Sequence, residues 1–339
     1  MKKETIQDQF NRPLRDLRIS VTDRCNFRCR YCMPREIFGA DHAFLPRAEL
    51  LTFEEIIRLA GIFHGFGLEK IRLTGGEPLL RKDLEKLINM LRDHFPDLEL
   101  ALTTNGSVLP YKAQALREAG LDRVTVSLDA LDDEIFQAMN DAGFTVGQVL
   151  KGIQTAEQAG FEDIKINMVV KRGVNEDQIL PMAEFFRGTG RILRYIEYMD
   201  VGNSNGWQNE QVVPAKEILQ TIHRAHPLEP LDPNYPGEVA NRFRYRDGKG
   251  EIGIIASVTQ PFCGDCTRLR LSAVGQLFTC LFASEGHDLR DLLRGGKTDQ
   301  EIAAFISSLW RSRDDAYSEE RFAGQAPDRD KVEMSYIGG

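Results

Sequence analysis

Six cysteines form two groups of three, near opposite ends of the sequence. They are Cys25, Cys29, Cys32, Cys263, Cys266 and Cys280. Tight groups of three are poor disulfide frameworks, and the first residues, MKKETIQDQFNRPLRD, have no apolar core that would make a secretory signal. We therefore expect a reducing cytosol, where structural disulfides are rare, and metal binding is the leading interpretation of both groups.

The first group, C-x-x-x-C-x-x-C, suits a 4Fe–4S cluster with one open iron. Cysteine thiolates hold such clusters, and three of them can hold three corners of the cube. The fourth iron is then free to bind a substrate or a cosubstrate. The alternative is a zinc site completed by a distant ligand. The spacing disfavours it, because zinc loops usually show paired C-x-x-C ligands.

The second group also offers three thiols, and here zinc is a stronger rival. Cys263-x-x-Cys266 is a common zinc half-site, and His287 could supply a fourth ligand. The run TRLRLS that follows alternates polar and apolar residues, so Arg268 and Arg270 share one strand face beside these cysteines. Guanidinium groups bind phosphate in bidentate fashion, which favours a phosphate clamp over two solvated arginines.

The chain between the two groups alternates strand and helix patterns. Six runs rich in β-branched and aliphatic residues are typical of buried parallel strands: 16–22, 70–74, 98–104, 123–129, 163–170 and 192–198. Helical periodicity covers 53–67, 81–95, 111–120, 145–160 and 176–188. Repeated βα units predict a parallel sheet, and we expect an α/β fold with an incomplete (βα)6 TIM-type barrel, since eight units close the usual one.

A change in composition marks the end of the predicted barrel. After a helical run at 215–226 comes the stretch PLEPLDPNYPGEVANRF, followed by shorter strand candidates. We therefore predict two domains: a partial barrel over 1–227 with the first cysteine group, and a cluster-binding domain over 228–339 with the second. The segments around 228–250 and 310–328 carry no usable signature.

Polar motifs follow the predicted strands, at the edge where barrel active sites lie. The second strand leads into Gly75-Gly76-Glu77-Pro78. Two glycines let backbone groups approach a ligand closely, and Pro78 restricts Glu77 to an extended conformation. The other strands end in or carry Thr104-Asn105-Gly106, Ser127-Leu128-Asp129, Asn167, Glu197 and Met199.

Cations along the same strands suggest an anionic ligand. They are Arg18, Lys70, Arg72, Lys165 and Arg194. Each alone could be a surface charge, but residue parity puts Arg18 on the face of Ser20, and Arg72 on the face of Thr74. A barrel lumen that holds several such side chains needs anions, because unpaired buried charge is costly.

Composition limits the partners. The net charge of −8 disfavours a general nucleic-acid footprint, and no apolar run is long enough to cross a bilayer. Hydrophobic content of 42% and charged content of 28% are ordinary for a soluble enzyme. Both a monomer and a homodimer are compatible with the sequence.

The cysteine loop followed by GGEP resembles the radical S-adenosylmethionine (SAM) superfamily. With TTNG, VSLD, FCGDCTRLRLS and a final GG, nearly the whole chain resembles its GTP 3′,8-cyclase family, lyases of molybdenum cofactor biosynthesis. The resemblance implies two 4Fe–4S clusters, the first binding SAM and the second binding the guanine of GTP. Its implied SAM contacts are Tyr31, Gly75, Gly76, Glu77, Ser127, Asn167 and Met199.

The resemblance also implies GTP contacts and a role for the tail. The implied GTP contacts are Arg18, Lys70, Arg72, Thr103, Lys165, Arg194, Arg268, Leu269 and Arg270. Arg268 and Arg270 are implied to be catalytic together with Gly338 and Gly339. Two such glycines would ordinarily be a frayed end, but the family's double-glycine end reaches the active site.

The implied reaction starts when a 5′-deoxyadenosyl radical abstracts the ribose C3′ hydrogen of GTP. The carbon radical then attacks guanine C8, and the product is 3′,8-cyclo-7,8-dihydro-GTP. An external electron donor and a downstream cyclic pyranopterin monophosphate synthase are implied partners. The rival functions are a radical SAM enzyme acting on a peptide, and a non-enzymatic electron carrier or zinc-stabilised binding module.

Overall fold

One sheet of twelve strands runs through the computed structural model, which describes residues 4–327 and 329–339. The strands are β1 (Asp16–Ser20), β2 (Lys70–Thr74), β3 (Glu99–Thr104), β4 (Arg123–Ser127), β5 (Lys165–Val170), β6 (Ile192–Glu197), β7 (Leu228–Leu231), β8 (Asn241–Tyr245), β9 (Glu251–Ile255), β10 (Arg268–Leu271), β11 (Gln276–Phe278) and β12 (His287–Asp288). Residues 1–3 and residue 328 lie outside the described part. The first three belong to the amino-terminal segment in which the sequence predicts no secretory signal. No helix in the described ranges is long and apolar enough to cross a membrane.

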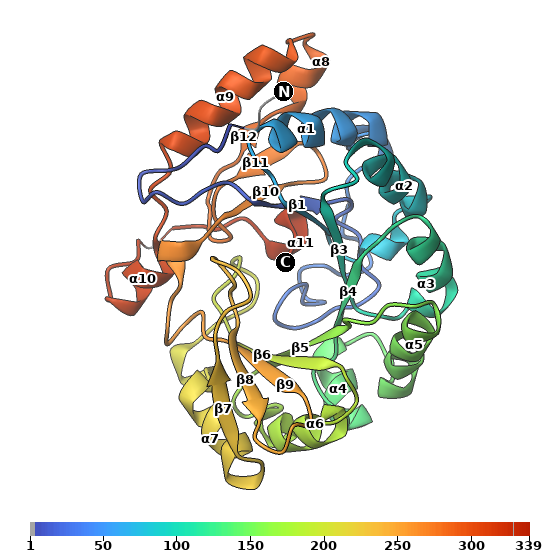
Figure 1. Cartoon of the computed structure of the whole chain (residues 1–339), viewed down its shortest axis with the longest axis vertical. Helices are drawn as coiled ribbons and strands as arrows, with labels where there is room; N and C mark the ends of the chain where they lie inside the picture. Colours follow the sequence, from blue (N-terminus) through green and yellow to red (C-terminus); the bar gives the residue numbers. More distant parts are fainter. Residues whose placement is uncertain (1–3, 328) are drawn as a thin grey trace.

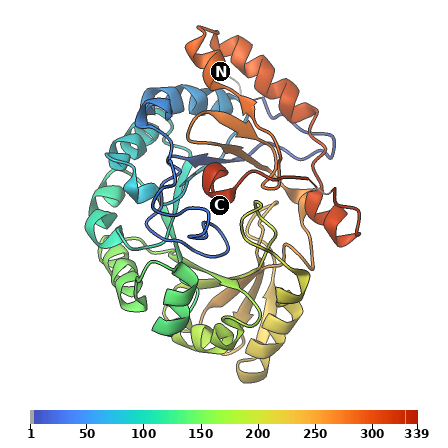
Figure 2. The ribbon, with the colours of Figure 1, turned by 180° about the vertical axis from the view of Figure 1, so that it is seen from behind.

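Most helices lie on the outside of the curved sheet, whereas α11 (Met334–Ile337) lies inside it (Figure 1). The other helices of the described ranges are α1 (Phe53–Gly65), α2 (Leu84–His94), α3 (Leu109–Glu118), α4 (Asp133–Asn140), α5 (Val146–Gln158), α6 (Ile179–Phe186), α7 (Ala215–Ala225), α8 (Arg290–Arg294), α9 (Asp299–Arg311) and α10 (Tyr317–Phe322). Single 3₁₀ turns include η2 (Pro78–Leu80) and η5 (Cys263–Asp265). Seen from behind, α11 and the last residues lie in the middle of the ring of elements (Figure 2).

The first six strands are parallel neighbours in chain order, as the repeated βα units predict. Capping boxes fix the starts of several helices. In α1 the Thr52 side chain accepts from the Glu55 N–H while the Glu55 carboxylate accepts from the Thr52 N–H. The partial barrel expected from the sequence is confirmed, with extra strands at both edges.

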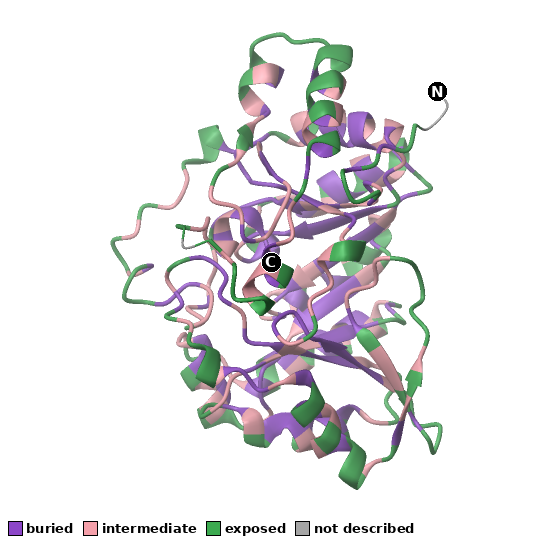
Figure 3. Ribbon diagram, turned by 90° about the vertical axis from the view of Figure 1, so that its left-hand side faces the viewer, coloured by how far each residue is buried: buried purple, intermediate pink, exposed green. Residues whose placement is uncertain are grey.

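Strand alternation separates the core from the lumen. In β2, Ile71 and Leu73 are fully buried in the main apolar core under the helices. The residues of opposite parity, Lys70, Arg72 and Thr74, point away from that core, because successive side chains alternate between the two faces. Buried strands at the centre and exposed outer helix faces are visible in Figure 3. The fold thus directs apolar residues outward to the helices and polar residues inward.

The segment after α7 extends both edges of the six-stranded sheet. β9 pairs in parallel with β6, and β10 pairs in parallel with β1. In the described ranges no ladder joins β7 to β12, so the sheet stays open. The pairing of β10 with β1 carries the second cysteine group to the amino-terminal strand. The proposed domain boundary near residue 227 falls between α7 and β7 and stays a prediction.

Several element boundaries differ from those expected. The first strand ends at Ser20 rather than at residue 22, and the fourth ends at Ser127 rather than at residue 129. Beyond β1, the Thr22 carbonyl accepts from the Gly76 N–H of a site loop, and beyond β4, the Asp129 side chain accepts from the Val169 N–H. The helical run at 176–188 is a 3₁₀ turn followed by α6, and α4 was not predicted.

Candidate active site

A chamber at the centre of the open barrel is lined by residues from both ends of the chain. Tyr31 of the first cysteine loop lines one side, and all three cysteines of the second group line another. Gly339 also reaches the lining. The fold therefore brings Tyr31 of the first cysteine loop, the second cysteine group and Gly339, which are far apart in sequence, to one space.

Hydrogen bonds within the first cysteine loop and to Asn105 hold the loop in shape. The carbonyl of Cys29 accepts from the N–H groups of Cys32 (2.9 Å) and Met33 (2.8 Å). Cys25 Sγ accepts from the Phe27 N–H at 3.4 Å, and Asn105 Nδ2 lies 3.8 Å from it. All three thiols are partly buried and unpaired by disulfides.

These thiols fit a metal cluster. Burial raises the pKa of Cys25 to about 11, and burial and the neighbouring Cys25 thiol raise the pKa of Cys29 well above its usual value. Three thiolates packed together are therefore unfavourable until a cation neutralises them, and coordination deprotonates a thiol outright. In the described ranges, no three Cys, His, Asp or Glu side chains converge as ligands of one ion would. Thiols that each hold a different corner of a 4Fe–4S cube need not converge.

The GGEP turn packs against the start of the cysteine loop. Gly75 has φ +145°, and a Cβ there would lie 2.3 Å from the Thr22 carbonyl oxygen. A Cβ on Gly76 would lie 2.4 Å from the carbonyl oxygen of Arg24. The close approach that these glycines permit is therefore to this chain's own backbone, whereas we expected approach to a ligand. Their contact with SAM stays a prediction.

Glu77 ties two of the strand-end motifs together. Its buried carboxylate accepts from Thr104 Oγ1 (2.7 Å), from the Asn105 N–H (2.7 Å) and from the Leu79 N–H (3.0 Å). Burial raises the pKa of this carboxyl to about 7 despite these bonds. Because these three partners belong to the protein, the carboxylate positions the GGEP and TTNG turns.

Tyr31 is oriented by the fourth strand end. Its hydroxyl donates to Asp129 Oδ2 at 2.8 Å, and Asp129 Oδ1 accepts from the Val169 N–H at 2.9 Å. Burial raises the pKa of Asp129 to about 6. Ser127 at the end of β4 and Met199 just after β6 also line the chamber, so these two predicted SAM contacts lie on its wall.

Buried arginines form a layer across the lumen. Register pairs Arg18 with Arg72 on one side and with Arg270 on the other. Arg72 donates to Thr103 Oγ1 at 3.1 Å, and Arg194 donates from Nε to Asn167 Oδ1 at 3.0 Å. All of these side chains line the chamber.

This layer is short of negative charge. Burial, then repulsion by Arg270 and Arg72, holds the pKa of Arg18 well below its usual value. Burial and Arg72 lower the pKa of Arg194 to about 9. Arg18 Nε is buried without a hydrogen-bond partner. Since buried charge needs compensation, the layer is suited to a polyanion.

The two predicted lysines lie closer to the amino ends of the strands. Lys70 begins β2 and pairs with Glu99 at 3.1 Å, while Lys165 begins β5. Burial and repulsion from Arg72 lower the pKa of Lys70 to about 8, and burial and Arg194 lower that of Lys165 to about 7. Unlike the arginines, neither is among the chamber-lining residues.

The second cysteine group lies in a cationic setting. Cys266 Sγ accepts from Arg268 Nη2 at 3.2 Å and from Arg313 Nη2 at 3.3 Å. Burial alone would raise the pKa of this thiol, but the two guanidinium groups outweigh it and lower the pKa to about 6. A thiolate is thus available as a cluster ligand. His287, the suggested zinc ligand, is exposed on β12 with its ring 6.4 Å from that of Phe305.

The double glycine lies against the arginine layer. Arg270 Nη1 donates to the Gly338 carbonyl, and Thr74 Oγ1 donates to the Gly339 carbonyl at 3.4 Å. Gly338 has φ +79°, and a Cβ there would lie 2.3 Å from Thr74 Cγ2. Only glycine fits this position without strain. Leu269 differs from its neighbours, because its side chain packs in the main core and leaves only backbone for a nucleotide.

Comparison with known proteins identifies the family. Residues 19–186 match the family described as Radical SAM superfamily, and residues 191–319 match Molybdenum Cofactor Synthesis C. The GTP 3′,8-cyclase of Acidothermus cellulolyticus is 57% identical, over 99% of both chains. The chain belongs to the GTP 3′,8-cyclase family. Relatives of the same name from Staphylococcus saprophyticus (48% identity, 99% of both chains) and Xanthomonas campestris (52%, 98% of this chain and 97% of the relative) agree.

Some chamber residues of this GTP 3′,8-cyclase family member were missed from the sequence. Tyr235 and Glu238 line the chamber from the Pro- and Gly-rich segment after β7, and Lys70 Nζ lies 5.7 Å from the Tyr235 ring centroid. Arg313 was missed as well. A tyrosine and a glutamate in a loop, or one arginine after a helix, have no local pattern that signals a site. Only the fold places them beside the cations and the cysteines.

Proposed function

We propose that this chain converts GTP to 3′,8-cyclo-7,8-dihydro-GTP, the first step of molybdenum cofactor biosynthesis. Family membership supports the reaction, and the layer of buried arginines between two cysteine groups supports the substrate. The layer matches the triphosphate of GTP in charge, and no peptide side chain carries comparable negative charge. The enzyme is thus a radical SAM lyase with two iron–sulfur clusters.

The cysteines would hold the cofactors. Cys25, Cys29 and Cys32 would hold the first 4Fe–4S cluster and Cys263, Cys266 and Cys280 the second. With SAM bound, they supply the one-electron chemistry that removes the ribose C3′ hydrogen and joins C3′ to guanine C8. The chain's own groups orient SAM, bind GTP and exclude water from the chamber.

Residues around the first loop are proposed to orient SAM. Asp129 holds Tyr31 at the chamber wall, while Ser127, Asn167 and Met199 approach from neighbouring strands. Gly75, Gly76 and Glu77 are proposed to present their backbone from the turn after β2. Because the Glu77 carboxylate is fully engaged within the protein, its role is to fix that turn.

The arginine layer is proposed to bind the triphosphate. Arg18, Arg72, Arg194, Arg268 and Arg270 would supply charge-assisted hydrogen bonds, Thr103 would add a hydroxyl, and Leu269 would add backbone groups. Lys70 and Lys165 would close on the phosphates from the amino ends of their strands. Phosphate binding relieves the mutual repulsion of these cations, so it restores the guanidinium pKa values that burial lowers.

The reaction is tested with GTP deuterated at C3′. Anaerobically reconstituted protein, given SAM and a reductant, should transfer this deuterium to 5′-deoxyadenosine and form the cyclic product. Deuterium-free 5′-deoxyadenosine in the presence of labelled GTP would contradict the proposal. A peptide-directed enzyme would cleave SAM without consuming GTP.

Replacing Arg18 by methionine should weaken GTP binding by roughly 1.5–3 kcal/mol, the range for hydrogen bonds to charged groups. Arg18 is a suitable residue to replace because its buried Nε has no hydrogen-bond partner. The variant therefore leaves the existing hydrogen bonds of the protein largely intact. Calorimetric titration gives the affinity. Arg172→Met, at an exposed ion pair with Glu217, is the control and should bind GTP normally. Equal affinity of the Arg18 variant and the wild type would refute the phosphate role.

GTP affinity should fall as the pH rises above 7. The lowered pKa of about 7 leaves Lys165 largely neutral at pH 8, and phosphate binding must then restore its proton. Uptake of one proton predicts a loss of up to about tenfold per pH unit. Lys165→Met should bind more weakly at pH 6.5 and lose most of this slope between pH 7 and 8, and the remainder comes from Lys70, whose pKa is lowered to about 8. The same slope in both proteins would show that another group titrates.

The remaining partners are also proposals. An external donor is proposed to reduce the first cluster, and a cyclic pyranopterin monophosphate synthase is proposed to consume the product. We place the enzyme in the cytoplasm, where its six free thiols would stay reduced. Native mass spectrometry of the reconstituted protein would separate a monomer from a homodimer.

A further inference from the structure

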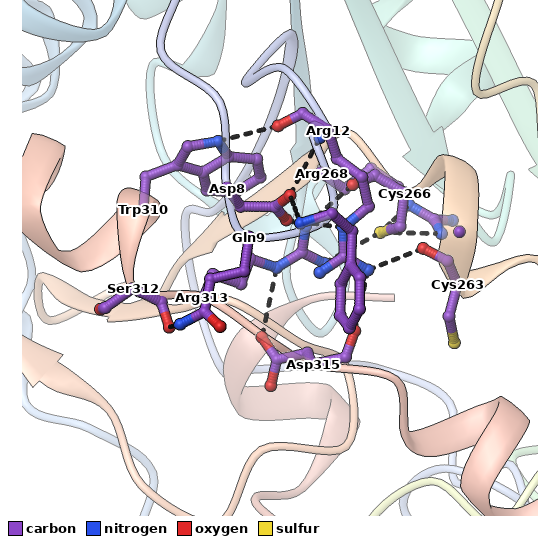
Figure 4. A network of polar contacts seen from close by, with 12 residues as sticks. Asp8, Gln9, Arg12, Cys263, Cys266, Arg268, Trp310, Ser312, Arg313 and Asp315 are labelled. Atoms are coloured by element: carbon purple, nitrogen blue, oxygen red, sulfur yellow. Dashed lines mark hydrogen bonds and ion pairs between the residues drawn. The ribbon is translucent and has the colours of Figure 1, made fainter.

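The loop of the second cysteine group is held by residues from outside it. Figure 4 shows Asp8 and Arg12, which precede β1, beside Arg313 and Asp315, which follow α9. These two segments are about 300 residues apart in sequence, and they contact each other next to the loop that carries Cys263 and Cys266. None of these four residues is among the predicted phosphate or SAM contacts.

A single buried carboxylate orients two guanidinium groups in this network. Asp8 is 6% exposed, and its Oδ2 accepts from Arg12 Nε at 2.6 Å and from Arg313 Nη1 at 3.1 Å. Its Oδ1 accepts from the N–H groups of Phe10 and Arg12. Both oxygens are thus satisfied, which fixes the directions of the two arginines.

The two arginines contact the cysteine loop differently. Arg12 Nη1 donates to the Cys263 carbonyl at 2.7 Å, which is a backbone clamp. Arg313 Nη1 donates to the Cys266 carbonyl at 2.8 Å, but its Nη2 also donates to Cys266 Sγ at 3.3 Å. Asp315 accepts from Arg313 Nε at 3.2 Å. A purely structural clamp needs only the carbonyl contacts, so the contact with sulfur points to a second task.

The two cysteine groups differ in the donors that their sulfurs receive. Cys266 Sγ accepts from the guanidinium groups of Arg268 and Arg313. Cys25 Sγ accepts from a backbone N–H and faces a neutral amide. Hydrogen bonds to cluster sulfurs and nearby charge set the reduction potential of an iron–sulfur cluster. Fixed positive charge favours the reduced form, which carries one more negative charge.

We propose that Arg313, oriented by Asp8, is a positioning residue that fixes Cys266 and raises the reduction potential of the second cluster. The inference rests on the proposed function, since it requires Cys263, Cys266 and Cys280 to hold that cluster. Asp8 acts through Arg313, because its carboxylate does not contact the cysteine. Together with Arg268, Arg313 therefore makes the two cysteine sites electrochemically unequal.

The test is a potentiometric titration followed by electron paramagnetic resonance, on full-length anaerobically reconstituted protein. A background in which Cys25, Cys29 and Cys32 are alanine isolates the second cluster. Arg313→Gln should shift its midpoint to lower potential, Arg313→Lys should recover part of the shift, and Asp8→Asn should move it in the same direction by less. Gln9→Ala is the matched control, because it removes the bond from Gln9 Nε2 to the Ser312 carbonyl, which joins the same two segments, without touching the Arg313 guanidinium or sulfur. It should lower stability and leave the potential unchanged.

Three outcomes would overturn the inference. The first is an unchanged midpoint in Arg313→Gln at full iron content. If that variant fails to hold a cluster, an unchanged midpoint in both Arg313→Lys and Asp8→Asn has the same meaning. The third is an equal shift in Gln9→Ala, which would indicate general loosening. Wild-type protein with iron and sulfide for one cluster only would instead refute the proposed function, and iron analysis separates that case.

Discussion

Replacing Cys29 by alanine should abolish SAM cleavage and leave the second cluster in place. The thiol is partly buried beside two others, and removing it takes away one of the three proposed cluster ligands. The fold should tolerate the change, because the bonds that shape this loop run from the N–H groups of Cys32 and Met33 to the Cys29 carbonyl. The measurements are 5′-deoxyadenosine production and Mössbauer spectroscopy of the iron.

Cys266→Ala is the matched comparison. It should lose the second cluster and GTP turnover and retain SAM binding, because its sulfur contacts Arg268 and Arg313 and none of the first loop. Each variant should hold about half of the wild-type iron. Loss of the same iron signal in both variants would contradict the assignment of two sites with different roles.

Deleting Gly338 and Gly339 should remove most turnover while both clusters remain. The Gly338 carbonyl is a hydrogen-bond partner of Arg270, and Gly339 lines the chamber, so the deletion leaves Arg270 free to shift in the substrate layer. The rest of the tail should stay in place, since Ile337 is fully buried and Tyr336 Oη lies 3.2 Å from Gln276 Oε1. Anaerobic turnover with GTP and iron content are the measurements.

Two further variants sharpen this test. Gly338→Ala should lose turnover as well, because its Cβ would clash with Thr74 at a positive φ. Gly324→Ala also has positive φ, but its Cβ would meet nothing within 4 Å, so it is the control for backbone strain alone. A synthetic peptide ending in SYIGG should restore part of the activity of the truncated protein. Full turnover after truncation would show that the tail has no catalytic role.

The sequence by itself determined the local parts of this protein. Cysteine spacing within each group, the alternation of strand and helix, and polar residues at strand ends are all readable over windows of ten to twenty residues. They predicted the parallel order of β1 to β6 and the inward direction of Arg18 and Arg72, because alternation along a strand is a local property. The eight-residue helix α4 was missed because about two turns contain too few positions for a periodic pattern to stand out.

Only the tertiary structure determined which residues far apart in sequence become neighbours. The pairing of β10 with β1 carries Cys266 to the amino-terminal strand, and Asp8 meets Arg313 across 305 positions. Neither contact leaves a periodic pattern in the sequence, because each depends on the path of the whole chain. The same reason explains Gly338, whose residue type suggested flexibility, while its place against Thr74 and Arg270 demands glycine. The spacing of residues along the chain indicates the local chemistry, but the shared chamber forms only when the open barrel brings both ends of the chain together.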